Sequence, residues 1–194
     1  MRLRITSGNL KGRYINVPKS ELVRPTTERV RETIFNILNN RMSFEGIKVL
    51  DMYAGSGALG FECLSRGADE VHFVEKNSVI YRVLEENIKL LQVESNCQIF
   101  KMPAIKFTSI KQKIEYDLIL ADPPFFKDDI YNVVGKILNN GYLRRDCFMI
   151  IERSIQTKQK DVENFKVEPF KIIGDACLYE ITYSNYARLP CFCF

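Results

Sequence analysis

The chain contains few of the residues that build metal sites or disulfide frameworks. Its 194 residues include no tryptophan, one histidine, and six cysteines without a Cys-x-x-Cys pair. The single histidine, His72, is flanked by apolar residues in a predicted strand. This pattern argues against zinc ligation and against disulfide bonding. We therefore expect no metal ion and a reduced, cytoplasmic setting.

Long apolar runs are absent as well. The sequence has no stretch of about 18 apolar residues, the length that spans a bilayer. It also lacks the apolar N-terminal run typical of a signal peptide. Hydrophobic residues make up 46% of the chain, which is enough to bury one substantial core. We expect one catalytic domain that acts as a monomer without contacting a membrane.

The chain as a whole has little excess of either charge, but its N-terminal segment has a clear excess of positive charge. The net charge is +4, from 28 Lys and Arg against 24 Asp and Glu, so a general attraction to nucleic acid is not evident. The basic N-terminus predicts a surface that faces phosphate groups; a solvated basic terminus is the alternative. Its cations are Arg2, Arg4, Lys11, Arg13, Lys19, Arg24, Arg29 and Arg31, against Glu21 and Glu28.

Residues 1–45 are predicted to form a small N-terminal unit. Two strand-like runs, 2–6 and 13–17, flank a turn-rich segment, which indicates a β-hairpin. Thr26 or Thr27 can cap a helix in which apolar residues recur at helical spacing. The apolar stripe of this helix is expected to pack on the main domain.

Residues 46–186 alternate between strand-like and helix-like segments, which predicts a parallel sheet with helices on both faces. The last two strand-like runs lack a helix long enough for a parallel crossover, so they could form an antiparallel edge hairpin. Residues 187–194 form an apolar tail without an assigned role. The expected strands are 48–53, 70–75, 96–100, 116–121, 148–152, 166–173 and 178–183, and the expected helices are 58–66, 78–91 and 129–139.

A glycine-rich segment, Asp51-Met-Tyr-Ala-Gly55-Ser-Gly57-Ala-Leu-Gly60, links a predicted strand to a predicted helix. Its glycines permit a tight turn and the close approach of a ligand at the carboxyl edge of the sheet. Glu75 follows twenty residues after Gly55, where a carboxylate can hold ribose hydroxyls. A dinucleotide or another adenosine-containing cofactor would satisfy these residues.

Asp51 helps to separate the two kinds of cofactor. A carboxylate at the strand tip can attract the amino group of a methionine moiety, directly or through water, whereas it would repel a pyrophosphate. The pattern therefore favours S-adenosylmethionine. The alternatives are that Asp51 only orients the loop and that Glu75 is a plain strand-end carboxylate.

A second motif, Asp122-Pro-Pro-Phe125, follows the run Tyr-Asp-Leu-Ile-Leu-Ala and should lie at the same edge of the sheet. Prolines lack N–H donors, so nearby carbonyls can point inward as acceptors. The Asp122 carboxylate and the Pro123 carbonyl could accept both N–H bonds of an amino group and align its nitrogen for attack on a sulfonium methyl. Phe125 could stack on the base, and Asp122 or water could then take the proton. The alternative is a rigid turn with a core phenylalanine.

These motifs resemble those of class I S-adenosylmethionine-dependent methyltransferases. The chain as far as about Tyr183 is similar to the bacterial family that methylates N2 of guanine 966 in 16S rRNA. The resemblance rests on Gly8-x-x-Lys11-Gly12-Arg13, Arg24-Pro-Thr-Thr-x-Arg29-Val-Arg31-Glu32 and Phe35-Asn36-x-Leu38, joined to the two motifs above.

The resemblance implies a Rossmann-like, seven-stranded, mostly parallel sheet preceded by a hairpin and a helix. It also implies that the partner is 16S rRNA in an assembled or assembling small subunit. Arg29 and Arg31 could instead pair with Glu28 and Glu32 on the helix surface. The candidate residues are Asp122, Pro123 and Phe125 for catalysis; Asp51, Ala54, Gly55, Ser56, Gly57, Glu75 and Ala104 for the cofactor; and Arg13, Arg24, Arg29 and Arg31 for RNA.

One departure from the family pattern follows the predicted strand 96–100. This fold usually carries an Asp or Asn there that binds the adenine amino group, whereas this chain has Pro103. The Ala104 N–H or the Met102 carbonyl could serve in its place.

Three other functions fit part of the pattern. An adenine-N6 methyltransferase acting on DNA or RNA could use the same Asp-Pro-Pro-Phe segment, and only the N-terminal signature argues against it. A nicotinamide-dependent dehydrogenase could use the glycine loop but lacks a candidate proton donor. A non-catalytic rRNA-binding assembly factor is opposed by the intact Asp51, Glu75 and Asp122.

Overall fold

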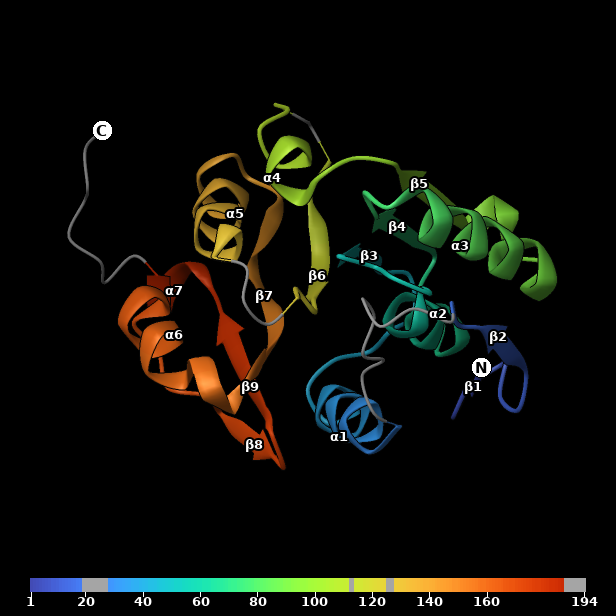
Figure 1. Cartoon of the computed structure of the whole chain (residues 1–194), viewed down its shortest axis with the longest axis horizontal. Coiled ribbons are helices and arrows are strands. Elements are labelled where there is room, and N and C mark those ends of the chain that lie inside the picture. The colour runs from blue at the N-terminus through green and yellow to red at the C-terminus, as the bar shows by residue number, and fades with distance from the viewer. Residues whose placement is uncertain (19–27, 112–113, 125–127, 187–194) are drawn as a thin grey trace.

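Within the described residues, seven strands form a central sheet with helices on both faces (Figure 1). The structure is a computed structural model that describes residues 1–18, 28–111, 114–124 and 128–186. The strand order is β5-β4-β3-β6-β7-β9-β8. In chain order the strands are β3 (Lys48–Met52), β4 (Glu70–Val74), β5 (Cys97–Phe100), β6 (Tyr116–Ala121), β7 (Leu143–Ser154), β8 (Lys171–Ile173) and β9 (Ala176–Ile181).

The sheet is mostly parallel. β3 pairs in parallel with β4 and β6, β4 pairs with β5, and β6 pairs with β7. β9 runs antiparallel to β7, and β8 runs antiparallel to β9 at the edge, which confirms the predicted edge hairpin. The chain runs from β3 out to β5 and returns to β6 on the other side of β3. The strand order therefore reverses between β3 and β6, the place where open α/β sheets bind ligands.

Different helices cover the two faces of the sheet. One hydrophobic cluster joins one face to α1 (Glu28–Asn39), α2 (Ala58–Ser65) and α3 (Ser78–Leu91). The other joins the opposite face to α4 (Ala104–Phe107), α5 (Asp129–Asn139) and α6 (Lys158–Phe165), with α7 (Tyr183–Tyr186) packed against it. Short 3₁₀ turns occupy Glu94–Asn96 and Ile155–Thr157.

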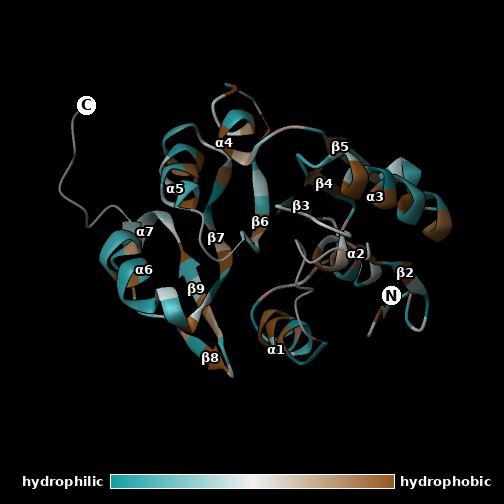
Figure 2. Ribbon diagram, in the orientation of Figure 1, coloured by the Kyte–Doolittle hydropathy of each residue, from teal (hydrophilic) through white to brown (hydrophobic). Residues whose placement is uncertain are grey.

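The alternation of side chains along each strand produces these two clusters. Val49 of β3 packs with α1, α2 and α3, whereas Leu50 and Met52 pack in the opposite cluster. All three side chains are fully buried, and each such burial contributes about 1.5–3 kcal/mol to folding. Figure 2 shows hydrophobic residues along the strands and interleaved with hydrophilic ones on α3 and α5, as expected for helices with one buried side.

The N-terminal hairpin forms a separate two-stranded antiparallel sheet of β1 (Arg2–Arg4) and β2 (Tyr14–Asn16). Ile5 and Ile15 are buried in the same cluster as α1 and α2, so the hairpin shares the core of the larger sheet. Gly8 has a φ of +77° and approaches α2 so closely that a Cβ there would lie 1.6 Å from the Ser65 carbonyl oxygen. Only glycine fits this contact.

Some elements differ from those predicted from the sequence. α6 was not expected, because its only apolar residues are Val162 and Phe165 and they give no clear stripe. The short helices α4 and α7 were also missed, and β7 begins at Leu143 rather than at residue 148. The proposed helix caps Thr26 and Thr27 and the tail 187–194 lie outside the described residues. In the described part of the chain, no helix is long and apolar enough to cross a membrane.

Candidate active site

The ends of neighbouring strands are level at the carboxyl edge of the sheet. Met52 of β3 pairs with Val74 of β4 and with Ala121 of β6. The residues that follow Met52, Val74 and Ala121 therefore leave the sheet side by side. They are Tyr53, Glu75 and Asp122, and the same row continues to Lys101 after β5 and to Glu152, which still belongs to β7. The pairing register thus brings both predicted motifs to one place.

The glycine-rich segment forms a tight loop between β3 and α2. Gly55 and Gly57 have φ values of +56° and +84°, and Tyr53 also adopts a left-handed φ of +61°. A Cβ on Gly57 would lie 2.5 Å from the Phe61 ring and 2.6 Å from Leu84. At Gly55 a Cβ would meet nothing closer than 3.9 Å. The loop is therefore packed tightly against the protein at Gly57 and is open at Gly55.

Asp51 lies beneath this loop and holds its far end. Its side chain is 2% exposed, and Oδ2 accepts the Gly60 N–H at 2.9 Å. Burial raises the pKa of the Asp51 carboxyl, the Gly60 hydrogen bond lowers it, and the Asp122 and Glu75 carboxylates raise it further. The hydrogen bond supports the loop-orienting role. The clustered carboxylates also make the edge favourable for a cation.

Glu75 joins the loop to the start of α3. Its Oε2 accepts the Gly55 N–H at 3.1 Å, and its Oε1 accepts the Asn77 N–H at 2.7 Å. Asn77 in turn caps α3 by accepting N–H bonds from Val79 and Ile80. Each carboxylate oxygen can accept more than one hydrogen bond, so these contacts leave acceptor capacity for a ligand.

The predicted reacting segment follows β6. Asp122 is partly buried, Pro123 is buried and Pro124 is exposed. The Asp122 carboxylate raises the pKa of the Asp51 carboxyl, as expected for two acidic groups on adjacent strands at one edge of the sheet. Phe125 lies outside the described residues, so its predicted stacking on a base stays a prediction.

Tyr53 was missed by the sequence reasoning. Burial raises the pKa of its hydroxyl, and the carboxylate of Asp129 at the start of α5 raises it further, whereas Arg153 lowers it. The tyrosine therefore brings the glycine loop near the helix that follows the Asp-Pro-Pro segment. No local sequence pattern marks Tyr53 as part of the site, because its position depends on a backbone turn with a φ of +61°.

Ala104 begins α4, and Pro103 occupies the N-cap position. The Pro103 carbonyl accepts N–H bonds from Lys106 and Phe107, so the proline is part of the helix start. The first N–H groups of a helix have no acceptor within it, so the Ala104 N–H at the start of α4 can donate to an adenine nitrogen. Ala104 is 4% exposed.

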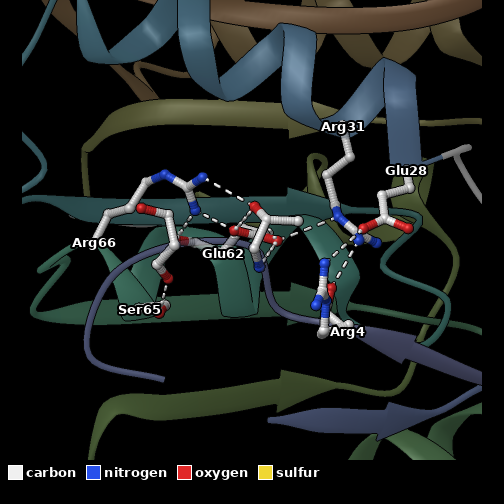
Figure 3. Close-up of polar contacts among 8 residues, drawn as sticks. Arg4, Glu28, Arg31, Glu62, Ser65 and Arg66 are labelled. Atoms are coloured by element: carbon white, nitrogen blue, oxygen red, sulfur yellow. Dashed lines mark hydrogen bonds and ion pairs between the residues drawn. The ribbon is translucent and has the colours of Figure 1, made fainter. Parts of the chain in front are cut away.

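The structure corrects the expectation that Arg31 contacts RNA. Its side chain is 1% exposed, and Nε lies 3.3 Å from Glu62 Oε1 on α2. It also donates to the Arg4 carbonyl at 2.8 Å. Figure 3 shows Arg31 reaching from α1 toward Glu62, with Arg66 on the other side of the same carboxylate. A guanidinium in this position cannot reach a phosphate, and its partner is not Glu28 or Glu32.

The Arg13 side chain binds backbone carbonyls of α3. Its guanidinium donates to the carbonyls of Leu90 and Leu91, at the end of α3. A cation is favourable there because carbonyls are unpaired at a helix C-terminus. Arg29 is exposed, and Arg24 lies outside the described residues. Among the described residues, no group of three His, Cys, Asp or Glu could hold a metal ion.

Known proteins resemble this chain over most of its length. It is 30% identical over 188 residues to the Ribosomal RNA small subunit methyltransferase D of Escherichia coli (strain K12), covering 96% of this chain and 90% of that protein. A solved Escherichia coli structure, provisionally assigned as a methyltransferase, gives a TM-score of 0.77 at 27% identity over 94% of this chain and 99% of that one. A precorrin-6y C5,15-methyltransferase from Geobacter metallireducens shares the fold, with a TM-score of 0.62 at 16% identity over 78% and 75% of the two chains.

The fold is that of the class I, Rossmann-like methyltransferases, with an N-terminal hairpin added. The family described as conserved hypothetical protein 95 matches residues 3–182, and the chain belongs to this family.

Proposed function

We propose that this protein transfers a methyl group from S-adenosylmethionine to the N2 amino group of guanine 966 in 16S rRNA. One observation carries the proposal: Met52 pairs with Ala121, so the glycine loop and Asp122 start from adjacent strand ends. The name of the Escherichia coli relative supports ribosomal RNA of the small subunit as the substrate. We further propose that the protein acts as a cytoplasmic monomer on an assembled or assembling subunit.

The residues of the loop fit this cofactor. S-adenosylmethionine carries a sulfonium and an ammonium, and Asp51, Glu75 and Asp122 gather negative charge at the site. Gly55 provides open space for a ligand, and Glu75 fixes its N–H while keeping acceptor capacity for ribose hydroxyls. Ala54 and Ser56 complete the loop, and the Ala104 N–H is the proposed adenine contact. When bound, the cofactor supplies an electrophilic methyl group.

The Asp-Pro-Pro segment positions the acceptor amino group. The Asp122 carboxylate and the Pro123 carbonyl accept its two N–H bonds and orient the nitrogen toward the methyl group. Phe125 stacks on the extruded base. The nitrogen becomes acidic after transfer, so Asp122 or water takes the proton without a stronger base.

Residues 1–45 form the RNA-facing part of this proposal, and residues 46–186 form the catalytic domain. On the hairpin, Arg4 pairs in register with Tyr14, so both point away from the face of Leu3 and Ile15 that meets the core. Arg4 and Tyr14 are exposed, as are the other cations of this surface, Arg2, Lys11 and Arg29. Exposed cations beside an aromatic ring suit a phosphate backbone with unpaired bases.

Transfer of labelled methyl from S-adenosylmethionine tests the proposal. The acceptors are unmodified small subunits, naked 16S rRNA and DNA, and the product nucleoside is identified after digestion. N2-methylguanosine confined to rRNA at position 966 is the expected product. N6-methyladenine would instead make the protein an adenine methyltransferase, and cofactor binding without any product would favour a non-catalytic assembly factor.

A further inference from the structure

One buried amide links the N-terminal hairpin to the glycine loop. Asn87 lies on α3 with 0% of its surface exposed. Its Oδ1 accepts the Asn16 N–H at 2.8 Å, and its Nδ2 donates to the carbonyls of Asn16 and Ser56 at 2.9 and 3.0 Å. Asn16 belongs to β2, and Ser56 lies between the two left-handed glycines of the loop. Three hydrogen bonds thus connect three segments.

The chemistry of these contacts requires an amide. The Asn16 N–H is a donor, so it fixes Oδ1 on that side and leaves the two Nδ2 hydrogens for the two carbonyls. A carboxylate of the same shape would face both carbonyls with an oxygen, and an apolar side chain would leave all three groups unpaired. A fully satisfied buried network of this kind holds its neighbours in one arrangement.

α3 supports the same connection along its length. Near its start, the Asn77 N–H holds Glu75, and in its middle Leu84 packs against Gly57. At its end, Arg13 of the hairpin region donates to the Leu91 carbonyl at 2.8 Å. The helix therefore contacts the cofactor loop and the hairpin at several points, and Asn87 is the residue that bonds to both.

We propose that Asn87 is a positioning residue that couples the hairpin to the cofactor loop. The inference rests on the proposed function, in which the loop holds S-adenosylmethionine and the hairpin meets RNA. Cofactor that orders Ser56 also strengthens the bonds from Asn87 to Asn16. By reciprocity, RNA that holds the hairpin in place favours cofactor binding.

Hydrogen–deuterium exchange on the full chain tests this coupling. The segment 14–17 is followed with and without saturating S-adenosylhomocysteine, and affinity for that ligand is measured by calorimetry. In the wild type we expect the ligand to slow exchange in this segment. In Asn87→Ala we expect that slowing to disappear and the affinity to fall about tenfold, because the Ser56 carbonyl loses its partner.

Asn185→Ala is the matched control. Asn185 accepts the Thr182 N–H at 2.8 Å and donates to the Glu180 carbonyl at 2.9 Å, so it makes similar bonds but touches neither the hairpin nor the loop. This variant should keep both the slowed exchange and the affinity. Asn87→Ser, which keeps one hydroxyl donor, should give intermediate values and carries the test if Asn87→Ala does not fold.

Two results would overturn the inference while leaving the proposed function intact. One is a wild-type protein that binds S-adenosylhomocysteine without any change in exchange at residues 14–17. The other is a control, Asn185→Ala, that loses the effect as fully as Asn87→Ala. A wild-type protein that does not bind the ligand would overturn the proposed function and the inference together.

Discussion

The Arg31 guanidinium on α1 and the Glu62 carboxylate on α2 form a buried ion pair, with Nε and Oε1 3.3 Å apart and both side chains 1% exposed. Glu62 also accepts the N–H and the hydroxyl of Thr6 and pairs with Arg66. α2 begins directly after the glycine loop. The arginine of the N-terminal signature therefore fastens α1 to the helix that follows the glycine-rich loop.

Replacing Arg31 should destabilise the protein. Arg31→Met leaves the Glu62 carboxylate buried with one cation fewer, which should lower the free energy of unfolding by about 3–5 kcal/mol. Arg29→Met, two residues earlier and exposed, should change it by less than about 0.5 kcal/mol. Denaturant unfolding of both variants checks this, and equal losses would contradict the assignment.

Substitutions of the same two arginines should differ in their effect on RNA binding. Removing the exposed Arg29 should flatten the dependence of RNA affinity on salt by about one unit of slope, because one phosphate contact is lost. Arg31→Met, measured at a temperature where it is folded, should keep the wild-type slope. A flattened slope in Arg31→Met with an unchanged slope in Arg29→Met would show that Arg31 reaches the RNA.

Two glycines of the hairpin region offer a matched test of close packing. Gly8 and Gly12 have similar left-handed φ values of +77° and +84°. A Cβ would collide with the Ser65 carbonyl at Gly8 but would meet nothing within 4 Å at Gly12. Gly8→Ala should therefore destabilise the protein by about 1–3 kcal/mol more than Gly12→Ala. Equal melting temperatures for the two variants would argue against the contact between the turn and α2.

Asp122→Ala should abolish methyl transfer while leaving cofactor affinity nearly unchanged. The side chain is assigned to the amino group, so its loss should lower kcat by at least about 100-fold. Single-turnover transfer and calorimetry with S-adenosylhomocysteine measure the two effects separately. Transfer at the normal rate would refute the assignment of the reacting site.

Asp51→Asn should weaken cofactor binding without lowering the free energy of unfolding of the cofactor-free protein. The pKa of Asp51 is raised in the folded state, so the folded protein binds more protons than the unfolded chain above the ordinary aspartate value. Its contribution to stability is thus present at low pH and falls as pH rises through the folded pKa. Asparagine does not titrate, so this fall in stability with pH should disappear. Its amide oxygen can still accept the Gly60 N–H. Unfolding at pH 5 and pH 8, with ligand calorimetry, checks both effects; unchanged affinity would leave only the loop-orienting role.

His72 should make stability depend on pH in the opposite direction. Burial lowers the pKa of His72, although Glu70 opposes this by accepting a bond from Nε2 at 2.5 Å. The unfolded chain therefore takes up the proton first, so stability is present above about 6.5 and falls as pH decreases toward the folded pKa. In His72→Gln the free energy of unfolding should depend less on pH between pH 6.5 and pH 5 than in the wild type. An equally steep wild-type and variant profile would contradict this.

The amino-acid sequence alone determined the strand–helix alternation and the place of both motifs. Alternating and helical periodicities are local, and glycine and proline mark turns within a few residues of the motifs, so strands such as 116–121 and helices such as 78–91 are confirmed. The Asp51 to Gly60 loop and Asp122 were also expected at one edge. The register of β3 with β6 bears this out.

Only the tertiary structure decided how the polar residues are used. Arg31 looked like a surface cation in the basic N-terminus, yet packing of α1 on α2 buries it beside Glu62. Asn87 carried one faint signal, an amide within the apolar stripe of α3, but its partners Asn16 and Ser56 are 71 and 31 residues away. Hydrogen bonds between residues so far apart in the sequence depend on how the elements pack, and no local pattern of residues records that packing.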